Sequence, residues 1–413
     1  ALDFVLCPTR RDGTRYIRSG ALIVNLLVIH VKLSTFCEGA TGTTRTYKNA
    51  LVKMPIEDGH VTVNINGQDQ HLRLDTGSSQ LRVMDGDWYE SRYGEGACLT
   101  PNKGCFYCPQ DALCDFDKDP TLTTSHSADG STIKSLSRHG SLTLGSCRID
   151  NFPFKVSREF SPKLKPPPRG YFGIAAPPQS LQGYPDGSSF LESLFRSGTI
   201  TKQVYFVRAL PTNNSKYITG ELTLGYGIDK SMAGRKIGSF RFFHGPLSHQ
   251  GFPTVRIVFV GLSNTGESPS GGEMYAHRYR QVFPSVLDTG STALFLPLPT
   301  LLEDIVMELK RNLRAKGYEE RVIASKYLLK DGKLAVYKNV VDALPVLNIR
   351  ISDEGMSVLV QLHPRHYCQD ARVPNSCQVA VSSSSISSLG TPFFLAYSMQ
   401  VDHTNHVISL FEN

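Results

Sequence analysis

Leu74-Asp-Thr-Gly-Ser-Ser-Gln-Leu81 returns later in the same chain as Leu287-Asp-Thr-Gly-Ser-Thr-Ala-Leu294. Each copy follows a strand-like stretch, residues 61–65 for the first and residues 282–286 for the second. A single Asp-Thr-Gly-Ser is typical of a β-turn. Two copies in the same order, each behind a strand, instead indicate two lobes built on one plan.

A second repeated element lies downstream of each motif. Tyr171-Phe-Gly173 ends 98 residues after Asp75, and Ser388-Leu-Gly390 ends 102 residues after Asp288. Because both elements recur in the same order at nearly the same spacing, the repeat extends through each half of the chain.

The composition predicts an all-β, two-lobed protein. A chain of 413 residues exceeds one ordinary core. Its 35 glycines and 24 prolines punctuate many short Val/Ile/Leu/Thr-rich runs, a pattern typical of strands. We expect an N-terminal lobe over 41–225 and a C-terminal lobe over 226–413, divided near Leu224-Gly-Tyr-Gly-Ile-Asp229. Few short helices are expected, and two are predicted over 188–197 and 299–316.

The net charge of +7 is modest for this length. The basic residues form no block interleaved with aromatic residues, so the sequence predicts a solvated basic surface and no nucleic-acid partner.

The first 40 residues resemble an export signal. Four arginines precede the short apolar run from Ala21 to Leu33, and small residues follow at Gly39 and Ala40. The run is short for a membrane span, although a signal-anchor stays open. Together with the glycosylation sequon Asn213-Asn-Ser215 it predicts a secreted or endomembrane and vacuolar protein.

Nine cysteines are clustered rather than spread. Cys368 and Cys377 form a close pair, and five cysteines lie between Cys98 and Cys147. Local pairs in an exported chain predict disulfides. The spacing from Cys98 to Cys114 also suits zinc, which is the alternative here. If cleavage falls near Ala40, seven cysteines remain and one is unpaired.

Two carboxyl groups that share one proton can hydrolyse an amide without a metal or a covalent nucleophile. One deprotonates water while the other protonates the carbonyl oxygen. Like charges a few ångströms apart cannot both ionise, so their pKa values separate, as in the aspartic proteases that serve as the general example of this effect. Asp75 and Asp288 are the candidate catalytic pair.

The residues that flank the two aspartates fit such a pair. The threonines can hydrogen-bond across the lobe junction, and the glycines leave room for the opposite carboxylate and for substrate. The serines can hydrogen-bond the outer carboxylate oxygens. These supporting residues are Thr76, Gly77 and Ser78 in the first motif and Thr289, Gly290 and Ser291 in the second.

The paired motifs with their downstream glycines resemble the pepsin-like aspartic proteases, from about Lys53 to the end of the chain. The resemblance implies a bilobal β fold, a cleft for an extended peptide, a β-hairpin flap over that cleft, a monomer and no cofactor or metal. It also implies a set of substrate-binding residues: Gly77, Asp129, Gly130, Gly290 and Thr292.

The chain departs from the family pattern at the flap. The stretch Ser125–Ser131 resembles the family's Tyr-Ala-Asp-Gly-Ser, but Ser127 replaces the tyrosine. Arg82 stands where the family has a tryptophan that contacts this tyrosine. The cysteine-rich stretch from Cys98 to Cys114 resembles the insertion of the nepenthesin-like branch.

The predicted function is therefore an aspartic endopeptidase that acts on internal peptide bonds of proteins. The alternative is a protease-like binding or inhibitor protein with weak or no turnover, which the missing flap tyrosine favours. A carboxylate-pair glycosidase gives no reason for a repeated Thr-Gly-Ser. His363 and His366 are read as surface histidines beside a disulfide rather than as metal ligands. The chain has no H-E-x-x-H, G-x-S-x-G or P-loop motif.

Overall fold

A computed structural model describes residues 51–99, 102–126, 130–160, 167–176, 189–210, 215–225, 234–243, 245, 251–264, 277–371 and 373–413. The predicted signal segment 1–40 lies outside these ranges, and so does the sequon asparagine at position 213. The lobe boundary predicted between residues 225 and 226 falls at the edge of a described range, so it stays a prediction.

The first half of the chain forms an eight-stranded sheet around the first motif. Its apolar residues alternate into a core that includes Leu72, Leu74 and Phe172. The strands, in sheet order, are β2 (His60–Ile65), β3 (Gln68–Asp75), β9 (Tyr171–Gly173), β4 (Leu81–Asp85), β8 (Cys147–Phe160), β7 (Thr132–Leu144) and β6 (Thr123–His126), with β5 (Cys105–Phe106) beside β4.

The second half forms a corresponding eight-stranded sheet and a smaller four-stranded one. The larger sheet contains, in order, β20 (Ser357–Leu362), β19 (Val346–Ser352), β13 (Thr254–Ser263), β15 (Phe283–Leu287), β24 (Ser388–Leu389), β16 (Leu294–Leu296) and β23 (Val381–Ser383), with β14 (His277–Tyr279) beside β13. The smaller sheet contains β17 (Tyr327–Lys330), β18 (Lys333–Tyr337), β22 (Ser376–Val379) and β21 (Cys368–Asp370).

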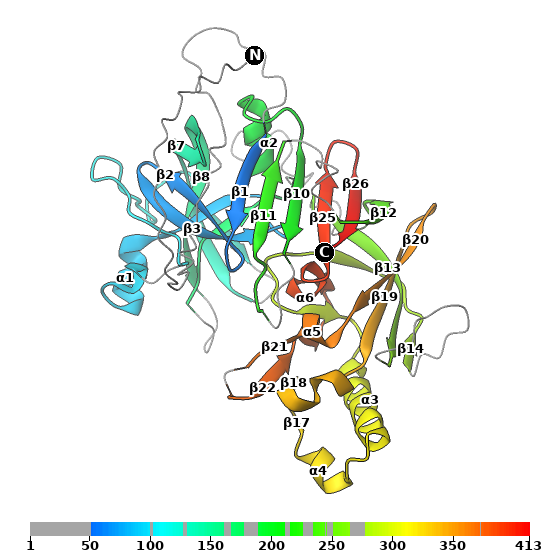
Figure 1. The fold of residues 1–413 in the computed structure, drawn as a ribbon. Coiled ribbons are helices and arrows are strands. Elements are labelled where there is room, and N and C mark those ends of the chain that lie inside the picture. Colours follow the sequence, from blue (N-terminus) through cyan, green and yellow to red (C-terminus); the bar gives the residue numbers. More distant parts are fainter. Residues whose placement is uncertain are drawn as a thin grey trace, which may run out of the picture. The chain divides into compact units, whose positions relative to one another are not determined.

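A six-stranded sheet combines strands from both halves, so it connects the lobes. Figure 1 shows β1, β11 and β10 side by side with β25 and β26 from the C-terminal end of the chain. In order, its strands are β1 (Val52–Ile56), β11 (Gly220–Leu224), β10 (Val204–Ala209), β25 (Tyr397–Asp402), β26 (Val407–Glu412) and β12 (Lys236–Arg241). The chain is thus the two-lobed, all-β protein that the repeat and the composition predict.

The two lobes share one local arrangement around the motifs. In the first lobe β9 lies between β3 and β4, parallel to β3 and antiparallel to β4. In the second lobe β24 lies between β15 and β16 in the same two senses. Each downstream glycine therefore follows or ends a strand packed against its own motif.

The strand that carries Asp75 differs from the one expected. Residues 61–65 belong to β2, which turns back at Asn66 and Gly67 into β3. Both turn residues have positive φ, 50° and 84°, as a two-residue hairpin turn requires. The strand leading to Asp75 is β3, which reads as polar in the sequence because only its last residues are buried on both faces.

The two predicted helices are present as α2 (Phe190–Arg196) and α3 (Leu301–Ala315). Ser189 caps α2 by accepting a hydrogen bond from the amide of Glu192 (3.1 Å). The short helices not expected are α1 (Gly86–Tyr93), α4 (Glu320–Ala324), α5 (Pro364–Tyr367) and α6 (Thr391–Phe394), with 3-10 turns η1 (Ala97–Leu99) and η5 (Lys338–Ala343). Within the described ranges no helix is long and apolar enough to cross a membrane.

Disulfides hold the cysteine clusters. Cys98 pairs with Cys105, Cys108 with Cys114 and Cys368 with Cys377. The zinc alternative is therefore wrong for the first four, because their sulfurs are bonded to one another. Cys147 is also disulfide-bonded. The other six described cysteines pair with one another, so the unpaired cysteine expected after cleavage near Ala40 stays a prediction.

Removing the Cys368–Cys377 bridge with a double alanine variant should lower the free energy of unfolding by about 2–3 kcal/mol. The loop it closes is short (sequence separation 9), and both sulfurs are buried, so the change adds a packing loss to the gain in unfolded-state entropy. Urea unfolding measures the difference. The control is the Cys98→Ala/Cys105→Ala variant, which opens a loop of similar length at a half-buried site. An equal loss in both variants would contradict the packing contribution.

Candidate active site

The two motifs meet through their threonines. The amide of Thr76 donates to Thr289 Oγ1 (3.1 Å), and the amide of Thr289 donates to Thr76 Oγ1 (3.0 Å). Each hydroxyl then donates to a carbonyl of the other lobe, Thr76 to Leu287 (2.6 Å) and Thr289 to Leu74 (3.0 Å). Both threonines are fully buried, so these four hydrogen bonds fix the two loops against each other away from water.

The glycines hold the inner carboxylate oxygens. The amide of Gly77 donates to Asp75 Oδ1 and that of Gly290 donates to Asp288 Oδ1, both at 2.8 Å. A Cβ on Gly290 would lie 2.6 Å from Asp75 Oδ1 and 3.0 Å from Asp288 Oδ1. The inner oxygens of both carboxyl groups therefore converge on the same point.

The outer oxygens are held unequally. Ser291 Oγ donates to Asp288 Oδ2 (2.8 Å) and lies 3.3 Å from Ser388 Oγ. The corresponding bond expected from Ser78 is not made, because Ser78 Oγ has no hydrogen-bond partner among the described residues. Ser78 Oγ instead lies against Gly173, 2.5 Å from where a Cβ would stand. The two carboxyl groups, called the dyad below, thus differ in the hydrogen bonds that hold their outer oxygens.

Asp288 has a perturbed pKa. Burial raises the pKa of Asp288 above its ordinary value, and the neighbouring Asp75 carboxylate raises it further. The hydrogen bonds from Ser291 and Gly290 act in the opposite direction. Because burial and the like charge outweigh those bonds, the pair retains a proton above the usual carboxyl range.

The other predicted substrate-binding residues lie at the margins of this centre. Thr292 is exposed at the end of the second motif, and its carbonyl accepts a hydrogen bond from Gln369 Nε2 (2.6 Å). Gly130 is exposed, with φ of 82°, at the end of the β6–β7 hairpin, which pairs from Thr123 with Ser135 to His126 with Thr132. Ser127 and Asp129 lie outside the described residues.

Arg82 has a partner that sequence reasoning missed. Its guanidinium lies over the ring of Tyr171, 4.7 Å from the ring centroid, and the two residues face each other across β4 and β9. Burial raises the pKa of Tyr171, with Arg82 acting against that rise. The position that the family fills with tryptophan is therefore occupied by a cation–π pair. The sequence signal was the tyrosine of Tyr171-Phe-Gly173.

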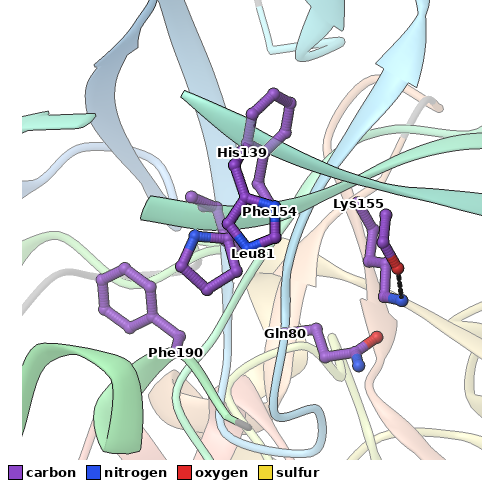
Figure 2. A pocket seen from close by; sticks show the side chains of 8 residues that line it. Gln80, Leu81, His139, Phe154, Lys155 and Phe190 are labelled. Atoms are coloured by element: carbon purple, nitrogen blue, oxygen red, sulfur yellow. Dashed lines mark hydrogen bonds between the residues drawn. The ribbon is translucent and has the colours of Figure 1, made fainter. Parts of the chain in front are cut away.

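A small pocket of about 20 Å³ lies beside the first motif loop. Figure 2 shows Gln80 and Leu81, which follow that loop, together with His139, Phe154, Lys155 and Phe190. Lys155 Nζ donates to Ser137 Oγ within it. The pocket is too small for a peptide side chain and its lining includes neither motif aspartate, so we assign it no role in the chemistry.

No group of three or more His, Cys, Asp or Glu side chains is placed to hold a metal in the part of the chain that the structure describes. His366 is buried, so the prediction of a surface residue is wrong for it. Its Nδ1 lies 3.2 Å from the amide nitrogen of His363 and its Nε2 lies 3.0 Å from Arg365 Nε, and a neutral ring accepts from one of these donors at a time.

Two β-lobes joined at their motif loops, with one carboxyl from each, place this chain in the pepsin-like class. A family model described as eukaryotic aspartyl protease matches residues 58–412. The chain therefore belongs to the eukaryotic aspartyl protease family. The match does not distinguish the nepenthesin-like branch within it. A search of curated proteins gave no match.

Substituting the two motif glycines should separate their roles. Gly290→Ala places a methyl group 2.6 Å from Asp75 Oδ1, whereas the nearest atom to a methyl group at Gly77 is 3.1 Å away. We expect Gly290→Ala to lower kcat/KM by about a hundred-fold, because the carboxyl must move, and Gly77→Ala to have a smaller effect. Kinetics on one peptide substrate, with melting temperatures of both variants, measure this. Equal losses would contradict the observed asymmetry.

Proposed function

We propose that this protein is an active aspartic endopeptidase in which Asp75 and Asp288 share one proton. The observation that carries the proposal is the convergence of their inner oxygens within loops locked by Thr76 and Thr289. Such locking pre-organises both carboxyl groups, so little reorganisation is needed during reaction.

The chemistry follows from one ionised and one protonated carboxyl. The ionised carboxyl takes a proton from a water molecule as that water attacks the scissile carbonyl, and the protonated carboxyl donates its proton to the carbonyl oxygen. The resulting tetrahedral intermediate collapses when the leaving amine takes up a proton from the pair. The raised pKa of Asp288 supports a protonated group at this position.

The substrate we propose is an extended peptide segment of a protein, bound by one protease molecule beneath the β6–β7 hairpin. The exposed Gly130 and Thr292 lie on segments that such a peptide would contact. Disulfides in the described chain support synthesis through an oxidising compartment, hence a secreted, endomembrane or vacuolar location.

The alkaline limb of the pH profile of kcat/KM should lie closer to neutral pH than the ordinary pKa of an aspartate would place it. Activity needs one proton on the pair, and it is lost as pH rises through the raised pKa of the folded enzyme. The same proton stabilises the fold below the ordinary aspartate pKa, and that contribution is lost as pH rises through the folded pKa. We expect the alkaline limb of kcat/KM to lie above pH 5. A limb below pH 4 would contradict the raised pKa.

Incubation of the protein with a denatured protein substrate from pH 3 to 8, with and without pepstatin, tests the function. The proposal predicts internal cleavages that pepstatin abolishes. Pepstatin binding without any cleavage would favour the alternative, a protease-like binding protein.

A further inference from the structure

Strand β3 buries a cation beside the dyad. Arg73 is only 3% exposed and lies two residues before Asp75, so the two side chains project from the same face of the strand. Its Nη2 donates to the carbonyl of Thr289 (3.3 Å), the residue that follows Asp288. One guanidinium is thus connected to both motif loops.

The guanidinium is poorly compensated. Among the described residues no carboxylate forms an ion pair with Arg73, and its Nε and Nη1 have no hydrogen-bond partner. Its main contact is the ring of Tyr217, with the guanidinium carbon 4.4 Å from the centroid. Burying a cation in this way is costly. Burial lowers the pKa of Arg73, and attraction to groups including Tyr217 and Asp288 acts against that.

The second repeat shows that the fold does not need this residue. The position two residues before Asp288 is Val286, which is also buried, and Leu287 corresponds to Leu74. An apolar side chain, Val286, therefore occupies the corresponding buried position in strand β15. The arginine at position 73 calls for a role beyond packing.

Resting on the function proposed above, we infer that Arg73 is a positioning residue that tunes the dyad: its cation favours the singly ionised pair, and its tether to Thr289 holds the second loop. A fixed positive charge lowers the pKa of nearby carboxyl groups. Its removal should raise the pKa of Asp288 and move the pH profile upward.

Other titratable groups surround this site and have to be accounted for. His60, 5% exposed, has its pKa lowered to about 4 by burial and then by Arg73, so it titrates on the acid limb. The alkaline limb is therefore the cleaner measurement. The remaining groups that act on the guanidinium are Arg169, Tyr171 and Tyr217, and Lys103 acts in turn on Arg169 and Tyr217. The groups that face the dyad are Tyr171 and Tyr205.

The test compares pH profiles of kcat/KM for wild type, Arg73→Met, Arg73→Gln and Arg73→Lys. Glutamine keeps a donor for the Thr289 carbonyl without the charge, and lysine keeps the charge without the planar fork. We expect the alkaline limb to rise by about one pH unit in the methionine and glutamine variants and to stay near wild type in the lysine variant. The matched control is Arg148→Met, which removes an equal charge from an exposed ion pair with Asp150.

Reduced kcat/KM with both limbs of the pH profile unchanged would mean that Arg73 acts only on structure. A wild-type pH profile in Arg73→Gln would overturn the charge effect. If the methionine variant does not fold, the glutamine variant decides. A second measurement, ¹³C-carboxyl NMR titration of Asp75 and Asp288 in wild type and Arg73→Gln, needs no turnover. An upward shift there supports the inference even if the chain proves inactive, and no shift overturns it even if the protease is active.

Discussion

Asp75→Asn and Asp288→Asn should each lower kcat by about a thousand-fold or more while leaving the protein folded. An amide has nearly the shape of the carboxyl but can neither take a proton from water nor share one with its partner. The loops should persist, because the threonine hydrogen bonds and the Gly77 and Gly290 amides do not depend on a negative charge. Single-turnover kinetics and a thermal melt on each variant measure the two effects separately.

The matched control for these variants is Asp69→Asn. Asp69 lies on the same strand as Asp75, but it is exposed and accepts a hydrogen bond from Asn64 at the surface. It should retain wild-type kcat. If either dyad variant also kept near-normal kcat, the two-aspartate mechanism would be wrong for this chain.

Most of the architecture was predictable because the repeated motif relates residues that lie far apart in the chain and shows that both halves share one plan. The motif pair fixed the two lobes, and the downstream glycines marked β9 and the end of β24. The preceding strand was misidentified because β3 begins with four consecutive polar residues, Gln68 to His71, and shows no alternation of polar and apolar residues there. Period-2 patterning detects a strand only where one face is solvated, and the last residues of β3 are covered on both faces.

The same reasoning explains why Arg73 was missed. Alternation places it on the face of His71 and Asp69, which are exposed. Tyr217 and the second motif loop cover that face only at Arg73, and both come from distant parts of the chain. The unequal roles of Ser78 and Ser291 were also hidden, because the two motifs are identical at that position and differ only in their packing.

Gly173 and Gly390 leave no room for a methyl group beside the two motif loops. A Cβ on Gly173 would lie 2.5 Å from Ser78 Oγ and 2.7 Å from the backbone of Gln80. A Cβ on Gly390 would lie 2.4 Å from the carbonyl oxygen of Ala293 and 2.5 Å from that of Ser291. In both lobes the glycine permits close packing of the downstream segment against its motif loop.

We therefore expect Gly173→Ala and Gly390→Ala each to lower the free energy of unfolding by about 3 kcal/mol, at the upper end for overpacked cores. Activity should fall further than stability requires, by about a hundred-fold, because the displaced loop carries a dyad carboxyl. Chemical unfolding and kcat/KM measured on the folded fraction separate the two losses. Gly355→Ala is the control, since only Asp353 Oδ1 comes within 4.0 Å of its Cβ position.

A second substitution should restore stability to the glycine variant of one lobe and not to that of the other. At Gly173 the nearest atom is a side-chain hydroxyl, so Ser78→Ala should restore part of the stability of Gly173→Ala and leave the contact with Gln80. At Gly390 the two nearest atoms are backbone oxygens, so no side-chain truncation should restore Gly390→Ala. A double-mutant cycle measures the coupling between Ser78 and Gly173. Full stability in Gly390→Ala, or no coupling in that cycle, would show that the downstream segments do not pack on the motif loops as closely as the structure indicates.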